Sequence, residues 1–291
     1  MIDFHLHSSA SDGTDSPSKI IDIAINKKLK AIALTDHDTI DGIHEFLKYG
    51  EDKDIITISG IEISIKHEPE RDIKDVHIVG LNIDFESNEL IKTLKSQSKG
   101  RIDQKREICE RLHEEFGYKI SFDEVKEIAG GKTIGRPHIV EILIRNNPEL
   151  SREKNRDEIF RMISLGGPAY VERKFELTLE SAIDLIDSAG GIPILAHPGI
   201  YNVENKTKFI RMCVEAGIKG IEIEYTYNKN RPWENTDRAE WAQNYFPDFF
   251  RKLAEKFNLI KSGGSDYHGS KKNIMIGEAN VPDEYLKKFL Y

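Results

Sequence analysis

The chain has 291 residues, of which 38% are hydrophobic and 32% are charged, so it can bury a substantial core. No apolar run approaches the roughly 18 residues of a membrane span, and polar residues near the amino end interrupt the apolar core that a secretory signal needs. The formal charge of −8 argues against bulk nucleic-acid binding, and two cysteines exclude a disulfide framework. We therefore expect a globular protein of the cytoplasm.

The first thirteen residues, MIDFHLHSSASDG, predict a strand followed by a short turn. Apolar residues alternate with polar ones from Ile2 to His7, so His5 and His7 share one face of the strand. The small residues that follow allow the chain to turn back and bring Asp12 near the two histidines. This segment is a candidate part of a metal site.

Three further strands are expected before residue 86. After a helix that begins at Ser16-Pro17, residues 30–35 predict a short strand that leads into Asp36, His37 and Asp38. Residues 55–64 predict a third strand, in which Glu62 lies among isoleucines and needs a partner if it is ionised. Residues 76–81 predict a fourth strand, which contains His77.

From residue 87 to residue 173, helical patterns replace the alternation of strands and helices. Residues 92–115 predict a long charged amphipathic helix, and Ser121 and Glu124 have the spacing of a capping box. Arg136-Pro137 begins another helix, and residues 153–164 predict a further one. We expect residues 87–173 to form an inserted helical cap domain that contacts the substrate.

The alternation returns after residue 173. Helices at 179–189, 206–216 and 249–257 alternate with strands at 192–196, 220–225 and 259–262, and a helix near 283–290 follows. The polar and aromatic segment Asn228 to Pro247 is expected to be a long loop with one short helix. Seven strands that alternate with helices predict an α/β barrel, formed by residues 1–86 and 174–291, with its site at the carboxyl ends of the strands.

Histidines and carboxylates recur within or just after these strands. A lone histidine or a carboxylate at a loop start usually has a structural role, but recurrence at equivalent strand ends favours ligands, because those ends meet at one rim. The set exceeds what one ion uses, since zinc takes about four ligands and manganese about six. We therefore expect two or three divalent ions. The candidate ligands are His5, His7, Asp12, His37, Glu62, His77, His197, Asp266 and His268.

The order of these residues resembles the motifs of the polymerase and histidinol phosphatase (PHP) superfamily of metal-dependent phosphoesterases. The matching segments span the chain: His5-Leu6-His7 with Ser11-Asp12-Gly13, Thr35-Asp36-His37-Asp38, Gly60-Ile61-Glu62, His77, Ala196-His197-Pro198 and Gly264-Ser265-Asp266-Tyr267-His268-Gly269. The resemblance implies a distorted seven-stranded, TIM-like βα barrel that holds three metal ions.

The resemblance also implies how the ligands are shared. By analogy, His5, His7, Glu62 and Asp266 hold one ion, and Glu62 shares a second ion with His77 and His197. Asp12, His37 and His268 hold the third. Thr35, Asp36 and Asp38 are expected to orient these ligands. The sequence does not choose between Mn²⁺, Zn²⁺ and Fe²⁺, because histidine and carboxylate sites accept all three.

The helical insertion resembles that of a subgroup that acts on nucleotides, through Gly135-Arg136-Pro137-His138 and Tyr170-Val171-Glu172-Arg173. Arg136 and Arg173 are candidates to clamp a phosphate, because a guanidinium fork matches phosphate oxygens. In the alternative interpretation, Arg136 begins a helix and Arg173 is a solvated linker residue. His138 is a further candidate for substrate binding. The segment Asn228 to Pro247 is longer and more aromatic than expected for the subgroup, and it is a candidate border of the substrate site.

These observations predict hydrolysis of a phosphate monoester or terminal diester by a metal-activated hydroxide. The expected substrates are nucleoside mono- or bisphosphates, or the 5′ end of a short RNA. The basic residues between Lys92 and Arg111 form either an oligonucleotide track or the solvated face of a helix. Three alternatives stay open: a histidinol-phosphate-type phosphatase, an amidohydrolase-like enzyme that cleaves C–N bonds, and a regulatory domain that holds metal without turnover.

Overall fold

The computed structural model describes residues 1–129, 134–230, 233 and 235–290. The chain forms two compact units. Residues 1–94 and 177–291 form the first, which we call the barrel unit, and residues 95–176 form the second, which we call the helical unit.

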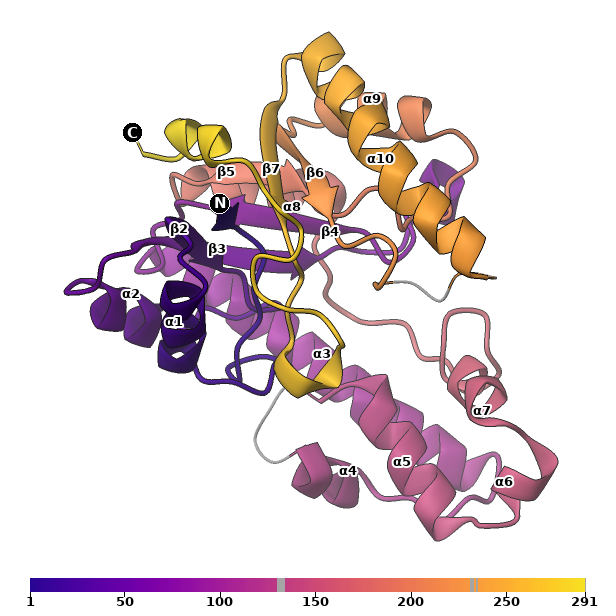
Figure 1. The fold of residues 1–291 in the computed structure, drawn as a ribbon. Helices are drawn as coiled ribbons and strands as arrows, with labels where there is room; N and C mark the ends of the chain where they lie inside the picture. Colours follow the sequence, from indigo (N-terminus) through magenta and orange to yellow (C-terminus); the bar gives the residue numbers. More distant parts are fainter. Residues whose placement is uncertain (130–133, 231–232, 234, 291) are drawn as a thin grey trace. The chain divides into compact units, whose positions relative to one another are not determined.

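The barrel unit is built on one seven-stranded sheet whose strand order follows the chain. The two edges of the sheet nearly meet, because residues that follow β1 bond to the end of β7 and the loop after it. The Phe4 amide donates to the Gly263 carbonyl over 3.1 Å, and the Asp266 amide donates to the His5 carbonyl over 2.9 Å. The predicted distorted α/β barrel is therefore confirmed (Figure 1). The strands are β1 (Ile2–Asp3), β2 (Ala31–Leu34), β3 (Ile56–Ser64), β4 (His77–Leu81), β5 (Ile192–Leu195), β6 (Gly220–Tyr225) and β7 (Ile260–Gly264).

Strand β4 is the distortion in this barrel. It runs antiparallel to both β3 and β5, whereas the other neighbouring pairs from β1 to β7 are parallel. The connection from β3 to β4 contains only the short 3₁₀ helix η1 (Pro69–Arg71), and a parallel crossover needs a longer connection. His77 therefore lies at the amino end of β4, and the expectation of ligands at carboxyl strand ends is wrong for this residue. The antiparallel direction nevertheless places His77 opposite Ser64, at the rim where β3 ends.

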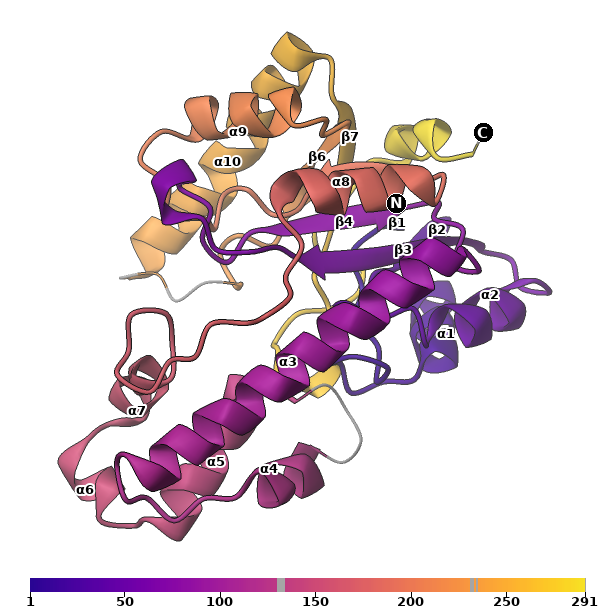
Figure 2. The same ribbon diagram turned by 180° about the vertical axis from the view of Figure 1, so that it is seen from behind.

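Helices cover the outside of the barrel. In Figures 1 and 2, α1 and α2 lie side by side beside β2 and β3, α8 lies against β4 and β5, and α9 lies near α10 on the β6–β7 side. Each helix buries an apolar stripe, as α8 does with Ala182, Ile183 and Ile186. Their bounds are α1 (Pro17–Asn26), α2 (Ile43–Gly50), α8 (Leu179–Ser188), α9 (Lys206–Glu215) and α10 (Thr236–Phe257), with η2 (Gly269–Lys271) and η3 (Asp283–Lys288) near the carboxyl end.

Helix α10 is longer than the sequence predicts. Residues 236–247 are predicted to be mostly loop, with one short helix, but α10 begins at Thr236, with the Asn235 side chain accepting from the Arg238 amide over 2.9 Å. Phe246, Phe250 and Leu253 are buried at helical spacing, and this packing outweighs the internal Pro247. The expected loop also included residues 231, 232 and 234, which lie outside the described residues. The helix predicted near residues 283–290 also differs, because it is the 3₁₀ helix η3, which ends at Lys288.

The helical unit has its own core. It contains most of α3 (Asn88–Glu114) together with α4 (Phe122–Ala129), α5 (Arg136–Asn146), α6 (Leu150–Glu153) and α7 (Arg156–Met162). Ile108, Leu112 and Val125 are among the fully buried residues of this core. The predicted capping box is present, because the Glu124 amide donates to Ser121 Oγ and the Ser121 amide donates to Glu124 Oε2. No helix among the described residues is long and apolar enough to cross a membrane.

Candidate metal centre

His5 and His7 follow β1, which ends at Asp3 and is shorter than the predicted strand, and both histidines are buried where the barrel closes. After β1 the chain runs beside the end of β7, with the His7 amide donating to the Tyr267 carbonyl over 3.0 Å. His5 and His7 are fully buried, and their ring centroids lie 5.1 Å apart. A β-carbon at Gly264 would collide with the backbone nitrogen and β-carbon of His5, so only glycine allows this close approach.

Glu62 lies at the middle of the cluster and is fully buried on β3. Each of its carboxylate oxygens faces more than one imidazole nitrogen. The distances to Oε2 are 3.2 Å from His5 Nε2, 3.3 Å from His7 Nε2 and 2.9 Å from His37 Nδ1, and those to Oε1 are 2.9 Å from His77 Nδ1 and 2.8 Å from His197 Nε2. One carboxylate therefore connects the ends of several strands.

Asp266, His268 and Asp12 extend the cluster away from Glu62. Asp266 Oδ1 lies 3.3 Å from His7 Nε2 and 3.3 Å from His268 Nδ1. On its other side, His268 Nε2 lies 3.3 Å from Asp12 Oδ1. Asp12 is the more exposed end, since 41% of its side chain is accessible. Asp266 and His197 both adopt positive φ angles, of 58° and 28°, which are strained for residues other than glycine and are common at functional sites.

The polar atoms of this cluster fit a metal centre. Ligand atoms about 2.0–2.2 Å from one ion lie about 3 Å from each other, which matches the spacings between these side chains. Several of the atoms are buried and have no hydrogen-bond partner among the described residues, although buried polar atoms are normally paired. These atoms are His5 Nε2, both ring nitrogens of His7, Asp12 Oδ1, His37 Nδ1, Glu62 Oε2 and His197 Nδ1.

Four groups of these side chains have ligand atoms within 4.8 Å of one another. They share members, so a bound ion in one group would have a close neighbour in the next. The groups are His7, Asp12, His37 and His268; His5, His7 and Asp266; His5, Glu62 and His197; and His37, Glu62 and His77. All nine residues predicted as ligands therefore lie in one cluster. His37 contacts both Glu62 and the group around Asp12, whereas the resemblance assigned it to Asp12 alone.

The charges in the cluster are arranged to be shared with a cation. Burial opposes ionisation of Glu62, but His37, His5 and His77 outweigh it and hold the pKa of Glu62 well below its usual range. Burial also opposes protonation of His7, yet Asp266 and Glu62 raise its pKa to about 9. Glu62 is therefore ionised at neutral pH, and the carboxylates of Glu62 and Asp266 favour a proton on the His7 ring. Divalent ions would supply the positive charge that these protons supply.

Glu222 contacts two of the candidate ligands and is not among the residues predicted from the sequence. It is fully buried on β6, its Oε1 lies 2.8 Å from His5 Nδ1, and its Oε2 accepts from the His197 amide over 2.7 Å. A carboxylate on the second nitrogen of an imidazole fixes the ring and makes the first nitrogen a better ligand. The available signal was a repeated pattern, since Gly220-Ile221-Glu222-Ile223 matches Gly60-Ile61-Glu62-Ile63.

Tyr225 and Lys272 were also missed, and both contact Asp266. The Tyr225 hydroxyl and Lys272 Nζ donate to Asp266 Oδ2 over 2.6 and 2.8 Å. These bonds occupy one carboxylate oxygen and leave Oδ1 directed at the histidines.

The motif after β2 positions the first loop. Asp36 accepts hydrogen bonds from the amide and hydroxyl of Ser8 and from the Ser11 hydroxyl, so it fixes the turn that leads to Asp12. Thr35 Oγ1 accepts from the Leu6 amide over 3.1 Å. Asp38 Oδ1 accepts from the Ser64 amide over 2.9 Å.

The candidate substrate residues Arg136, His138 and Arg173 belong to the helical unit, not to the metal cluster. Arg136 Nη1 donates to Ser164 Oγ over 3.2 Å, and its guanidinium lies 5.1 Å from the Phe160 ring centroid. His138 Nδ1 accepts from the Gly135 amide over 3.1 Å, so this ring caps α5. Arg173 Nη1 lies 3.0 Å from Glu176 Oε1.

Comparison with known proteins gives one family and several relatives. The family model described as PHP domain matches residues 3–175. The 5′-3′ exoribonuclease Rnm of Escherichia coli is 30% identical over 271 residues, which cover 91% of this chain and 84% of that protein. The 3′,5′-nucleoside bisphosphate phosphatase of Chromobacterium violaceum is 30% identical over 272 residues, covering 92% of this chain and 87% of that protein.

Solved structures are similar over most of the chain. A protein from Bifidobacterium adolescentis named as a metal-dependent phosphoesterase has a TM-score of 0.75 at 23% identity, covering 99% of this chain and 95% of that chain. A C. violaceum protein named as an amidohydrolase, with bound sulfate, has a TM-score of 0.71 at 30% identity, covering 92% of this chain and 88% of that chain.

Proposed function

Since this chain belongs to the PHP domain family and is a metal-dependent phosphoesterase, we propose that its substrates are nucleotides. The proposed reactions are release of phosphate from nucleoside mono- or bisphosphates and removal of nucleotides from the 5′ end of a short RNA. The observation that carries the proposed metal-dependent chemistry is the buried cluster around Glu62, whose imidazole and carboxylate atoms are spaced for metal ions. Several of these atoms have no hydrogen-bond partner among the described residues.

The proposed ligand sets are those that the family resemblance implies, and several of the distances support them. His5, His7, Glu62 and Asp266 would hold one ion, His77, His197 and Glu62 a second, and Asp12, His268 and His37 a third, with His37 also near Glu62. Mn²⁺, Zn²⁺ and Fe²⁺ all suit mixed nitrogen and oxygen ligands. When bound, such ions lower the pKa of water and neutralise phosphoryl oxygens in an in-line displacement.

The protein's own contribution is to hold these ligands in fixed orientations. Glu222 holds the ring of His5, and Tyr225 and Lys272 hold the carboxylate of Asp266. Because Glu222, Tyr225 and Lys272 already hold these ligands by hydrogen bonds, we infer that the ligands move little when an ion binds. Such preorganisation is what metal-assisted hydrolysis requires.

The helical unit supplies the proposed binding site for a phosphate that does not react. Lys105, which is 6% exposed, has a pKa lowered well below its usual value by burial and by the neighbouring Arg173, Arg136 and Arg101. Arg173 Nε has no hydrogen-bond partner among the described residues. A bound anion would reduce the repulsion between these positively charged groups around Lys105. Phosphate is a suitable anion, because guanidinium groups match the geometry of its oxygens. We assign this role to Arg136 and Arg173, and a capping role to His138.

The remaining expectations belong to the same proposal. The partner is a small phosphorylated molecule, a nucleotide or a short oligonucleotide, and the compartment is the cytoplasm. The net charge of −8 disfavours binding to long nucleic acids, whereas a short substrate needs only local cations.

The direct test is phosphate or nucleotide release by the purified protein with Mn²⁺. The panel contains nucleoside mono- and bisphosphates, short 5′-phosphorylated RNAs, histidinol phosphate and amide substrates. We expect release from the nucleotide substrates, and loss of at least a hundredfold in kcat/KM in Glu62→Gln, while the surface variant Glu51→Gln keeps wild-type activity. Turnover of histidinol phosphate alone, or of amides alone, would contradict the proposal, as would full activity in Glu62→Gln.

A further inference from the structure

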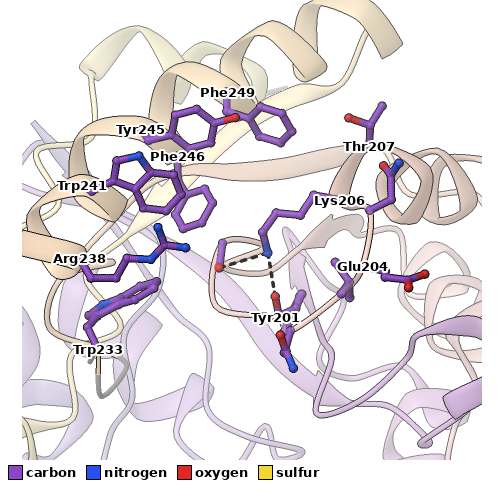
Figure 3. Close-up of a pocket in the computed structure, with 14 residues that line it drawn as sticks. Tyr201, Glu204, Lys206, Thr207, Trp233, Arg238, Trp241, Tyr245, Phe246 and Phe249 are labelled. Atoms are coloured by element: carbon purple, nitrogen blue, oxygen red, sulfur yellow. Dashed lines mark hydrogen bonds between the residues drawn. The ribbon is translucent and has the colours of Figure 1, made fainter. Parts of the chain in front are cut away.

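The barrel unit contains a cleft that the metal chemistry does not use. It lies between α10 and the segment from Gly199 to Thr207, which is the loop before α9 and the start of that helix, and its volume is about 610 Å³. This volume is within the range of small-molecule sites. Figure 3 shows one wall formed by Trp233, Arg238, Trp241 and Phe246, with Lys206, the first residue of α9, facing it.

The wall from α10 exposes aromatic rings that a soluble protein normally covers. Trp241 is 39% exposed and Tyr245 is 44% exposed, and their rings stack with centroids 4.8 Å apart. Tyr245 stacks in turn on Phe249, at 5.5 Å. Exposed aromatic patches beside polar groups mark binding sites, and flat rings suit a planar aromatic ligand.

Arg238 adds an anion-binding group to this wall. Its guanidinium carbon lies 4.1 Å from the Trp241 ring centroid, and among the described residues the guanidinium has no hydrogen bond or ion pair. A guanidinium stacked on a ring keeps its N–H groups at the edge of the stack, where they are available for a phosphate. Glu204 lines the opposite wall, away from Arg238 (Figure 3).

One residue of the cleft lining, Tyr201, also contacts the metal centre. Gly199 follows the candidate ligand His197 by two residues, and the Tyr201 ring lies 5.5 Å from the His197 ring. The Tyr201 hydroxyl accepts from the His77 amide over 3.0 Å. Lys206 Nζ donates to the carbonyls of Pro198, Gly199 and Tyr201, so the loop that joins the two sites is held in place.

We propose that this cleft binds a second nucleotide of a short single-stranded RNA whose reacting phosphate is at the metal centre. The base packs against the aromatic wall, and a backbone phosphate is bound by Arg238. This inference rests on the proposed nucleotide specificity and deepens it, because a substrate with one nucleoside would leave the cleft empty. Base–aromatic contacts accept any base, so the cleft selects for chain length and not for sequence.

The kinetic test compares a 5′-phosphorylated tetraribonucleotide with a 3′,5′-nucleoside bisphosphate. In Arg238→Gln and in Trp241→Leu, we expect KM for the tetranucleotide to rise about 5- to 100-fold. KM and kcat for the bisphosphate should stay within about twofold, because that substrate does not reach the cleft. The matched control is Arg211→Gln, which removes the same charge from the exposed face of α9 and should change neither substrate.

A binding test separates this inference from the proposed function. The chain has two tryptophans and both line the cleft, so intrinsic fluorescence reports on it. In EDTA, where hydrolysis stops, the tetranucleotide should quench this fluorescence, and Arg238→Gln should raise its Kd while Arg211→Gln does not. Quenching without any phosphoesterase activity would support the cleft and contradict the proposed function. If both cleft variants keep the wild-type KM and Kd for the tetranucleotide, the cleft proposal is wrong, and its occupant is another class of partner.

Discussion

Glu222, on β6, holds two of the candidate metal ligands in position. Its two oxygens contact His5 Nδ1 and the His197 amide, so it fixes one candidate ligand by its ring and another by its backbone. In Glu222→Gln one of these contacts becomes unfavourable, because the amide group would face an N–H donor. We expect metal affinity to fall about 10- to 100-fold, with kcat recovering at saturating metal.

The measurement is a metal titration against a chelator of known affinity, followed by rate measurements at high Mn²⁺. Glu224→Gln is the matched control, since Glu224 lies on the same strand but pairs with Arg251 over 2.7 Å. Its metal affinity should equal that of the wild type. An unchanged affinity in Glu222→Gln would show that His5 is held by packing alone.

The sequence predicts the inner residues of this cluster better than the residues that support them. His5, His7 and Asp12 are recognisable because ligand-type side chains interrupt an apolar pattern. Glu222 repeats the Gly-Ile-Glu-Ile pattern of Glu62, but its contact with His5, 217 residues away, cannot be predicted from that pattern. Lys272 and Tyr225 are hidden for the same reason, because their role depends on the closure of the barrel.

At the scale of elements, helix α3 carries a buried lysine that makes stability depend on pH. Burial and the nearby Arg173, Arg136 and Arg101 hold the pKa of Lys105 well below that of an unfolded chain. Between the folded and the unfolded pKa the unfolded state binds more protons, so stability rises with pH in that window. Lys105→Met removes this dependence, and we expect it to stabilise the protein more at pH 7 than at pH 9.

Denaturant unfolding at the two pH values, followed by probes in the helical unit, measures the difference. Lys99→Met removes an exposed lysine from the same helix and should give equal, small effects at both values. A gain from Lys105→Met that is the same at pH 7 and pH 9 would contradict the lowered pKa, because it would mean that Lys105 stays protonated in the folded protein throughout this range. The same variant should weaken binding of a phosphorylated substrate, since the proposed phosphate site loses an amine that a bound anion would favour in its protonated form.

Elements are predicted well where local patterns dominate and poorly where packing decides. Pro17, Ser121 and the strand runs from β2 to β7 follow local signals. The direction of β4 depends on a connection too short for a crossover helix, and the start of α10 depends on aromatic residues that bury one face against the barrel. Both are tertiary effects that outweigh local propensity.

At the scale of the whole molecule, both units have a hydrophobic core but only one contains candidate metal ligands. Every candidate ligand belongs to the barrel unit, where they join the ends of strands from β1 to β7, whereas the helical unit has a hydrophobic core of its own. Alternating strands and helices predicted the barrel from the sequence. The same prediction placed every candidate ligand in the barrel, and the structure adds that the helical unit has a separate hydrophobic core.

Metal should therefore stabilise one unit and not the other. An ion that binds only the folded state adds RT ln(1 + [M]/Kd), which is about 4 kcal/mol at a thousandfold excess over Kd. Hydrogen exchange with Mn²⁺ and with EDTA measures where this energy acts. We expect added metal to slow exchange in β1, β3, β5 and β7, and to leave α4, α5 and α7 unchanged. Equal protection of α5 and β3 would mean that the two units unfold together. The ligands, Glu62 among them, all belong to the barrel unit. Metal binding can therefore slow exchange in the helical core only if opening of that core also unfolds the barrel.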